Sequence, residues 1–416
     1  MTRRGRRTGR RTVPRAGSVL ALAAATTVTA AAIAVTPAGA ATTTVTGAAV
    51  TGESTRPVGG RPAHGCGDRR AVQRALDTLT GTYGLAGAAV EVAGPGCGRW
   101  TSASGVADVR TGRPMSAGQR VRIGSTTKTF TATVVLQLAA EGLVELDAPV
   151  ERYLPGLIRG NGHDGRAITV RGLLRHTSGL PDHVSALDWT RLDTFRFRRF
   201  EPREQVAVAL ALPRPGSAWN YSTTNYVIAG MLIEKVTGHG VTEEVTRRII
   251  RPLGLRGTYW PGGSTRIRGP HPRGYTLVTE AGGDTRRTDV TEFDMSYGGA
   301  GGALVSTLAD ENRFFAALLG GRLLPPVRLA QMVRTVPADP ERTWPGARYG
   351  LGLFSTPLRC GGRYWGHGGT VPGYDTAGGI TADGRRVQLV LNQNIDSAEA
   401  HRTMLDAVQA ALCGGR

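Results

Sequence analysis

The chain has 416 residues, and its 51 Lys and Arg against 32 Asp and Glu give a formal net charge of +19. This length suits one large domain or two smaller ones. The basic residues are dispersed, without zinc-finger spacing, a basic helix or an aromatic RNA-binding motif. We therefore interpret most of them as solvated surface and expect no nucleic-acid partner, while a positive surface suits an anionic bacterial envelope.

The first 40 residues have the pattern of a secretory signal peptide. Seven arginines and no acid precede an apolar, alanine-rich run, and Ala38 and Ala40 then form an A-x-A cleavage site. We expect residues 1–40 to be removed, which leaves a secreted protein without a membrane span; an uncleaved anchor is the alternative. Residues 41–64 are small, polar and rich in Gly and Pro, which predicts a flexible leader before a catalytic domain over 65–416.

The chain has four cysteines: Cys66, Cys97, Cys360 and Cys413. An even number in an exported chain indicates disulfides, and three pairings are possible. We favour Cys66–Cys97 with Cys360–Cys413, because each pair lies within one terminal segment. A zinc site is the alternative, but no two cysteines have CxxC spacing, and we expect no metal and no cofactor.

The N-terminal third predicts a helix, two strands and a buried helix. Residues 68–84 have helical spacing, with Val72, Leu76 and Leu79 on one face. Residues 87–96 and 98–109 predict two strands joined by a turn that contains Cys97. From Ser125 we expect a helix to about Glu141, and its mostly apolar centre places it in a core.

The remaining elements predict an α/β (α+β) fold. Helical periodicity recurs in the middle of the chain, about 149–287, at 169–177, 202–212, 224–238 and 242–250. Strand patterns follow at 347–355, 362–369, 375–382 and 385–394, with a turn at Asp383-Gly384 and a final helix over 397–413. We therefore expect an antiparallel sheet flanked by N- and C-terminal helices, with an inserted all-helical subdomain.

One candidate for catalysis is Ser125 with Lys128. Lysine occurs at only two positions, 128 and 235. A serine hydroxyl needs a neighbouring base, and positions i and i+3 share one face of a helix. Burial can lower the pKa of a lysine until it acts as a base, whereas arginine stays protonated. The pattern predicts that Lys128 activates Ser125; an ordinary exposed lysine is the alternative.

Tyr221 is a second candidate, in a loop rich in Ser and Thr just before a helix. A phenol with a depressed pKa can shuttle a proton between nucleophile and leaving group. The alternative is a half-buried tyrosine whose hydroxyl has found a partner.

His367 is a third candidate, bracketed by glycines 366, 368 and 369 on a predicted strand. Glycine inside a strand often marks a close approach of backbone to a ligand. The N–H groups of Thr370 and Ser125 could then form an oxyanion hole. A glycine-rich bulge with a structural histidine is the alternative.

Together, Ser-x-x-Lys, Tyr-x-x and His-x-Gly in this order resemble the penicillin-recognising serine hydrolases, the serine β-lactamases and DD-peptidases. The segments RIGSTTKTF, ITVRGLLRHTSGL, NYVIAGMLIEKVTG and GHGGTVPGY extend the likeness over residues 68–413. It is nearest to secreted D-alanyl-D-alanine carboxypeptidases and class C β-lactamase-like hydrolases. The resemblance implies an acylated Ser125, Lys128 as its proton partner, Tyr221 as general acid/base and a positive charge from His367 near the substrate carboxylate.

Two positions depart from the family pattern. The second motif usually reads Tyr-x-Asn, but Thr223 takes the place of the asparagine, and Asn225 is a possible substitute. In the third motif Gly368 provides no hydroxyl, so Gly368 and Gly369 would line the substrate through backbone alone. His176, in the RHTSGL segment, is assigned a structural role by the resemblance.

The leading hypothesis is an exported, monomeric D-alanyl-D-alanine carboxypeptidase that acts on peptidoglycan stem peptides through an acyl-enzyme and is inhibited by β-lactams. An esterase or D-amino-acid amidase on the same scaffold is the alternative that Thr223 and Gly368 favour. A β-lactamase is a third option. A hypothesis of another class is a catalytically weak envelope-binding or penicillin-sensing protein.

Overall fold

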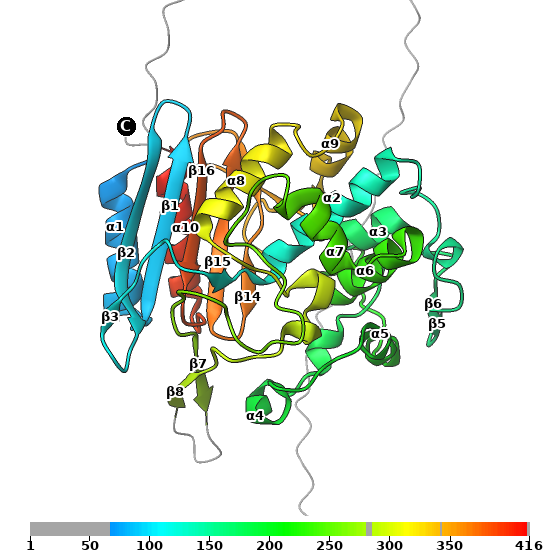
Figure 1. The fold of residues 1–416 in the computed structure, drawn as a ribbon, viewed down its shortest axis with the longest axis horizontal. Coiled ribbons are helices and arrows are strands. Elements are labelled where there is room, and N and C mark those ends of the chain that lie inside the picture. Colours follow the sequence, from blue (N-terminus) through cyan, green and yellow to red (C-terminus); the bar gives the residue numbers. More distant parts are fainter. Residues whose placement is uncertain (1–66, 280–284, 342, 414–416) are drawn as a thin grey trace, which may run out of the picture. The chain divides into compact units, whose positions relative to one another are not determined.

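The computed structural model describes residues 67–279, 285–341 and 343–413 (Figure 1). The predicted signal peptide, the leader and Cys66 lie outside these residues. Among the helices in the described ranges, none is both long enough and apolar enough to cross a membrane.

The centre of the fold is a ten-stranded sheet, antiparallel throughout, in the order β10-β11-β12-β13-β15-β16-β1-β2-β3, with β14 on β15. Strand β1 (Gly87–Gly94) pairs with its neighbour β2 (Gly98–Asp108) and with β16 (Arg386–Leu391) from the far end of the chain. The first and last thirds of the sequence thus build one sheet, which confirms the predicted fold class. The other strands of this sheet are β3 (Arg113–Pro114), β10 (Val336–Pro337), β11 (Arg348–Tyr349), β12 (Phe354–Pro357), β13 (Arg363–Gly366), β14 (Gly369–Val371) and β15 (Tyr374–Thr381).

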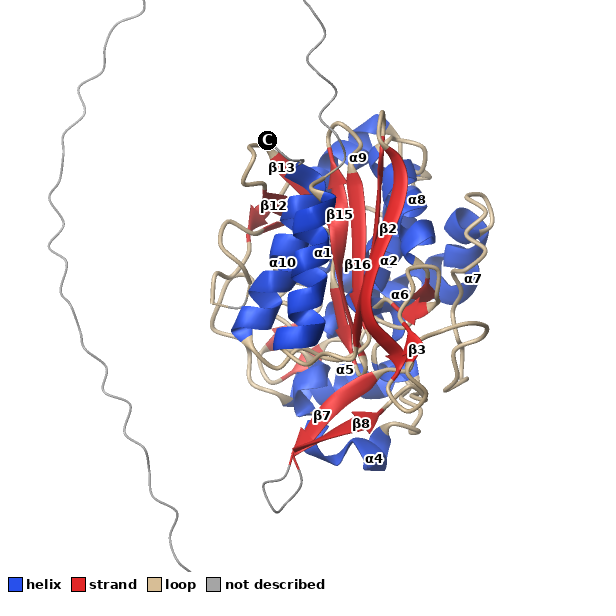
Figure 2. Cartoon of the chain, turned by 90° about the vertical axis from the view of Figure 1, so that its left-hand side faces the viewer, coloured by secondary structure: helices blue, strands red, loops and turns tan. Residues whose placement is uncertain are grey.

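Helices cover both faces of the sheet. Helices α1 (Arg69–Asp77) and α10 (Ala398–Cys413) lie side by side on one face, as Figure 2 shows. Val72, Leu76 and Leu79 are fully buried there, as their spacing predicts. On the other face, α8 (Leu308–Leu319) packs on β1, β15 and β16, and the apolar α2 (Thr127–Ala140) is buried on all sides, as expected.

The inserted segment contains the four predicted helices. The helices of this segment are α3 (Val170–Arg175), α4 (Leu192–Phe195), α5 (Pro202–Ala211), α6 (Thr223–Thr237) and α7 (Val241–Val245), while α9 (Pro326–Val333) follows later. The segment is not all-helical, however. It also contains hairpin β5 (Arg159–Gly160) with β6 (His163–Asp164) and most of hairpin β7 (Tyr275–Thr279) with β8 (Thr285–Asp289). The second hairpin is tied to the end of the main sheet: the Tyr275 N–H donates over 2.9 Å to the carbonyl of Asn392, the residue after β16.

One of the two favoured disulfides is confirmed. Cys360 and Cys413 are bonded, with their Cα atoms 5.5 Å apart, so the bond ties the loop between β12 and β13 to the end of α10. Cys97 is also disulfide-bonded. Its predicted partner, Cys66, lies outside the described residues.

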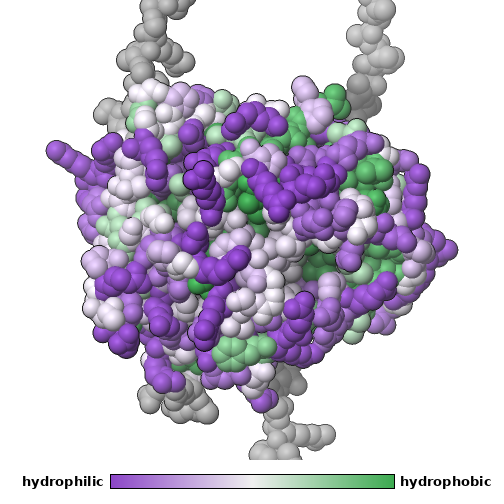
Figure 3. Space-filling model, viewed as in Figure 1, coloured by the Kyte–Doolittle hydropathy of each residue, from purple (hydrophilic) through white to green (hydrophobic). Residues whose placement is uncertain are grey.

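Hydrophilic side chains cover most of the face shown in Figure 3. Many arginines pair with acids at the surface of the described residues, for example Arg171 with both oxygens of Asp147 at 2.7 and 2.8 Å. This agrees with a solvated basic surface. Arg122 is an exception: it is fully buried and donates to the carbonyls of Thr265 and Thr291 at 2.6 and 3.1 Å.

Strand β14 lies against the turn that carries Ser125, and Gly369 allows this close approach. A Cβ at residue 369 would lie 2.2 Å from the Ile123 carbonyl oxygen and 2.7 Å from the Ser125 nitrogen. Real Cβ atoms do not approach backbone so closely. The predicted reason for glycine in this segment is a close approach of backbone to a ligand, whereas Gly369 allows a close approach to the backbone of the Ser125 turn.

We predict that Gly369→Ala moves β14 away from Ser125 and lowers kcat by about 100-fold, because catalytic groups tolerate little displacement. Steady-state kinetics of ester or amide hydrolysis measure this. Gly216→Ala is the matched control, since a Cβ there meets nothing within 4 Å. Wild-type kcat in Gly369→Ala would show that this packing does not position the site.

Candidate active site

Ser125 lies in a 3-10 turn, Gly124–Thr126, and α2 begins two residues later at Thr127. The expected α-helix at Ser125 is thus a tighter turn that continues into the helix. Lys128 follows one turn on, and its Nζ lies 3.0 Å from the Ser125 Oγ. The structure therefore brings together the pair that the Ser-x-x-Lys spacing predicts.

Lys128 is fully buried and forms no ion pair with any carboxylate in the described part of the chain. Its Nζ contacts the Gly301 carbonyl at 2.8 Å and the Thr223 Oγ1 at 3.4 Å. Burial lowers the pKa of Lys128 to about 7, against a smaller opposing effect of Asp182. When Lys128 is neutral, its two N–H groups can donate to the Gly301 carbonyl and to the Thr223 Oγ1. Its lone pair then remains free to accept the Ser125 proton.

Tyr221 stands beside this pair, just before α6. Its ring centroid lies 4.9 Å from the Lys128 Nζ, and its hydroxyl interacts with Ser125. The expectation of a depressed pKa is wrong: burial raises the pKa of Tyr221 by more than the bond to Ser125 lowers it. Tyr221 therefore keeps its proton and can donate it, whereas Lys128 can accept one. Because the pKa of Tyr221 is raised and the pKa of Lys128 is lowered, the first residue is suited to act as an acid and the second as a base.

His176 supports Tyr221 from behind. The two ring centroids are 4.3 Å apart, and His176 ends α3 in the left-handed conformation, with φ at 65°. Its Nδ1 accepts from the Ser222 N–H and from the Asn225 Nδ2, both at 3.1 Å. The imidazole thus fixes the backbone next to Tyr221, in keeping with the structural role expected for it.

Asn225 does not replace the missing asparagine of the second motif. It is fully buried, donates to His176 and accepts from the Ser178 Oγ over 2.7 Å. Two steps along a helix turn a side chain by about 200°, so Asn225 points away from the side of α6 that carries Thr223. Thr223 itself contacts Lys128 and lines the site. The prediction of Asn225 as a substrate-binding residue is therefore wrong.

His367 lies between β13 and β14 and is buried. Its Nε2 is 3.0 Å from the Tyr349 hydroxyl, and its Nδ1 contacts the Gly368 carbonyl. Burial, with a further contribution from Lys128, lowers the pKa of His367 to about 3. The prediction that His367 carries a positive charge is therefore wrong, because its imidazole is neutral near neutral pH.

Thr370 lies on the edge strand β14, which pairs only with β15 among the described strands. Both Ser125 and Thr370 line the two cavities described below. The backbone of β14 runs directly beside the Ser125 turn, as the contacts of Gly369 show. An oxyanion hole formed by the Ser125 and Thr370 N–H groups stays a prediction, and this proximity of the two backbones supports it.

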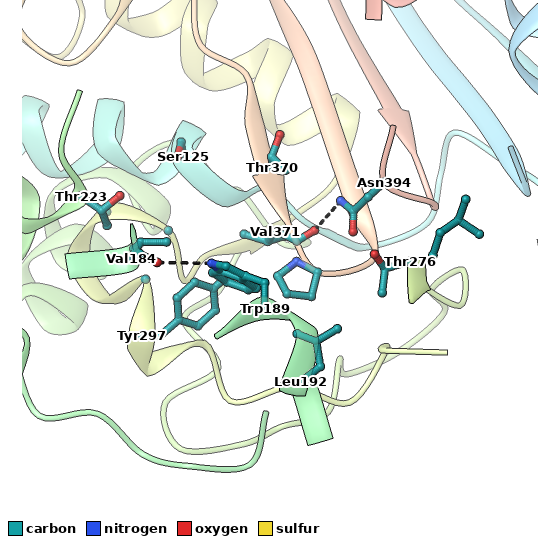
Figure 4. Close-up of a pocket in the computed structure, with 15 residues that line it drawn as sticks. Ser125, Val184, Trp189, Leu192, Thr223, Thr276, Tyr297, Thr370, Val371 and Asn394 are labelled. Atoms are coloured by element: carbon teal, nitrogen blue, oxygen red, sulfur yellow. Dashed lines mark hydrogen bonds between the residues drawn. The ribbon is translucent and has the colours of Figure 1, made fainter. Parts of the chain in front are cut away.

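An apolar cavity of about 370 Å³ opens on one side of Ser125. Figure 4 shows the Trp189, Leu192 and Tyr297 side chains converging on it opposite Thr370 and Val371. The Trp189 Nε1 donates to the Val184 carbonyl at 3.3 Å, and the Asn394 Nδ2 donates to the Val371 carbonyl at 2.9 Å. No sequence pattern marked these residues, because they come from loops, short helices and a sheet edge that lie far apart in the chain.

A second cavity of about 700 Å³ also reaches Ser125 and extends along β13, β14 and β15 to the start of α10. Tyr221, Gly368 and Gly369 line it near Ser125. Its acids are Asp182, Asp375 and Asp396. We call it the acidic cleft. Asp375 lies within a strand segment that the sequence predicts, but the period-2 pattern alone does not tell which of its side chains meets a ligand.

Comparison with known proteins identifies the family. The family model described as Beta-lactamase matches residues 72–412. The chain belongs to the beta-lactamase family. The chain is thus a serine hydrolase of this family, and the catalytic roles of Ser125, Lys128 and Tyr221 stay predictions that their proximity supports.

Several relatives within the family are amidases and an esterase. A D-stereospecific amidohydrolase from Streptomyces sp. is 39% identical with a TM-score of 0.75, over 84% of this chain and 100% of the other. A D-amino acid amidase from Ochrobactrum anthropi SV3, solved with L-phenylalanine, is 28% identical with a TM-score of 0.71, over 82% and 98%. Esterase EstB of Burkholderia gladioli is 36% identical over 183 residues, 41% of this chain and 46% of the esterase, so the chain matches less than half of that relative.

We predict that Lys128→Arg lowers kcat/KM by about 10²- to 10⁴-fold, because arginine cannot give up its proton. In the wild type, kcat/KM should fall as the pH drops through about 7, since protonation of Lys128 removes the lone pair that accepts the Ser125 proton. A pH–rate profile of both proteins measures this. Lys235→Arg is the control, since Lys235 is exposed on α6 and is the other lysine of the chain.

Tyr221→Phe should lower kcat on amides by about 10²- to 10³-fold, with a smaller loss on aryl esters. Amide nitrogen must be protonated to leave, whereas a phenolate leaves unaided. The ratio of amide to ester turnover in wild type and variant measures the effect. Equal losses on both substrates would contradict a role as general acid.

Proposed function

We propose that this protein is a serine amidohydrolase that hydrolyses amides and esters of D-amino acids through an acyl-enzyme on Ser125. The observation that carries the proposal is the 3.0 Å contact between the Ser125 Oγ and a buried lysine whose pKa is lowered to about 7. A lysine of this kind is neutral in a large fraction of molecules near neutral pH and can act as the base that a serine nucleophile needs.

In the proposed mechanism, the Ser125 Oγ attacks the substrate carbonyl while Lys128 takes the hydroxyl proton. The N–H groups of Ser125 and Thr370 stabilise the oxyanion, and each such donor is worth about 3 kcal/mol in the transition state. Tyr221 then protonates the leaving nitrogen and recovers a proton from Lys128. Water attacks the ester on Ser125 by the reverse path, which releases the acid and frees the serine.

The apolar cavity supports an aromatic or large aliphatic acyl group. Its volume of about 370 Å³ and its wall of Trp189, Leu192 and Tyr297 suit a side chain such as that of phenylalanine. The two solved relatives are a D-stereospecific amidohydrolase and a D-amino acid amidase, and from them we take the D configuration of the substrate.

A D-alanyl-D-alanine carboxypeptidase is the second candidate. The exposed Thr370, whose hydroxyl could bond a terminal carboxylate in the acidic cleft, favours it. Within the described residues, however, no lysine or arginine lines this cleft, and the pKa of His367 is too low for a positive charge. A leaving D-alanine would bring its carboxylate beside Asp375 without a cationic partner. We therefore rank the amidase first.

We also propose that the enzyme works outside the cytoplasm. The pattern of the first 40 residues supports this, and so does the Cys360–Cys413 disulfide, because structural disulfides persist mainly in oxidising compartments.

We expect turnover of D-phenylalanine amide at a rate at least about tenfold above that of the L-amide and of an acetylated D-Ala-D-Ala peptide, a difference of about 1.4 kcal/mol. Product release followed by mass spectrometry measures all three. Ser125→Ala should lose all three activities and form no acyl adduct. Faster cleavage of the D-Ala-D-Ala peptide would reverse the ranking of the two candidates.

A further inference from the structure

Asp375 is a buried carboxylate that the proposed mechanism does not use. It lies on β15 directly opposite Thr370 of β14, and 4% of it is exposed. Residues directly opposite in antiparallel strands carry their side chains on one face, about 5 Å apart. Asp375 therefore lines the acidic cleft one strand away from the backbone that is proposed to hold the reacting carbonyl.

The carboxylate of Asp375 is only partly satisfied by the protein. Its Oδ2 accepts from the Ile395 N–H at 2.8 Å, whereas its Oδ1 has no well-formed hydrogen bond within the described residues. Burial raises the pKa of Asp375 to about 6, although the Thr370 hydroxyl, the Ile395 N–H and the Asn394 side chain oppose this. Above that pH the cleft contains a desolvated anion, which a donor or a positive charge would stabilise.

The surroundings add negative charge. Asp182 and Asp396 line the same cleft, and none of the described residues among the 51 Lys and Arg does. The two histidines of the cleft, His367 and His401, both have pKa values lowered by burial. A chain with a net charge of +19 thus has an acidic cleft beside its nucleophile.

The acidic cleft lies on the side of the leaving group. Tyr221 lines this cleft and not the apolar cavity. A general acid must come within hydrogen-bond reach of the atom that it protonates. The part of a substrate beyond the scissile bond therefore extends into the cleft and toward Asp375.

We propose that the acidic cleft binds leaving groups that carry a protonated amine, and that Asp375 is the carboxylate that pairs with this amine. The inference rests on the proposed amidohydrolase function. The substrate class is D-aminoacyl amides of short diamines. Opposite side chains on β14 and β15 are about 5 Å apart, so the amine must bridge about this distance from the scissile amide to Asp375. This distance corresponds to about two to four carbons between the two nitrogens. The Ser125 Oγ bonds to the carbonyl carbon, the C–N bond breaks, and the diamine leaves with the proton that the Ser125 hydroxyl gave up.

The test compares two substrates that differ only at the end of the leaving group: the 3-aminopropylamide and the butylamide of D-phenylalanine. The α-amino group is common to both, so the ratio of their kcat/KM values isolates the distal ammonium. At about pH 8, where Asp375 is ionised and the amine is protonated, wild type should prefer the aminopropylamide by about tenfold or more, chiefly through KM. Asp375→Asn should bring the ratio to about 1.

Glu399→Gln is the matched control, because Glu399 is an exposed acid at the start of α10 that does not line the cleft. The ratio of the two kcat/KM values in this variant should equal that of wild type. A wild-type ratio near or below 1 overturns the proposal even if Asp375→Asn fails to fold, and so does an unchanged ratio in a folded Asp375→Asn. The absence of hydrolysis of any D-phenylalanine amide would instead overturn the proposed function. The two failures are therefore distinguishable.

Discussion

The burial of the Lys128 ammonium beside Ser125 is the constraint on which the rest of the site depends. A lysine in water stays protonated near neutral pH, and here burial without a carboxylate partner lowers its pKa to about 7. Three features of the fold produce this environment. Helix α2 is buried on all sides, the backbone at Gly301 approaches so closely that a Cβ would lie 3.3 Å from Nζ, and Thr223 of α6 closes the remaining side. A change in any of them alters the charge of the base.

The same low-dielectric environment acts on Tyr221 in the opposite direction. Burial disfavours the charged form of every group, so it keeps the phenol protonated while it neutralises the amine. One physical cause thus supplies both a proton acceptor and a proton donor at Ser125. His176 contributes through position alone, since its ring packs against Tyr221 at a tilt and it fixes the neighbouring backbone through Ser222.

In the proposed function, the two cavities that meet at Ser125 divide substrate recognition between them. The apolar cavity is built from side chains of the inserted segment, from Tyr297 beyond it and from β14, whereas the acidic cleft follows the sheet toward α10. Their different chemistry supports the proposal that a fold shared with penicillin-recognising enzymes suits a substrate without a terminal carboxylate here. The edge strand β14 is the shared wall, so its packing through Gly369 governs the geometry of both cavities.

The sequence by itself determined most of the elements and the proximity of Ser125 and Lys128. Hydrophobic spacing marked Val72, Leu76 and Leu79 as one buried face, because helical periodicity is local. Lys128, one of two lysines and three residues after Ser125, indicated a nucleophile with its base for the same reason: both residues lie on one turn of the chain. Local patterns could not supply protonation states or orientation.

Only the tertiary structure decided those properties, because they depend on burial and on partners far away in the chain. The carbonyl that Lys128 contacts belongs to Gly301, 173 residues away, and Asn225 turns away from the substrate because His176 and Ser178 bind it. His367 is neutral for a similar reason, since the fold buries it near Lys128. The sequence motifs identify the candidate residues. The burial and charges of the assembled core decide which of these residues are charged and which ligand charge the acidic cleft favours.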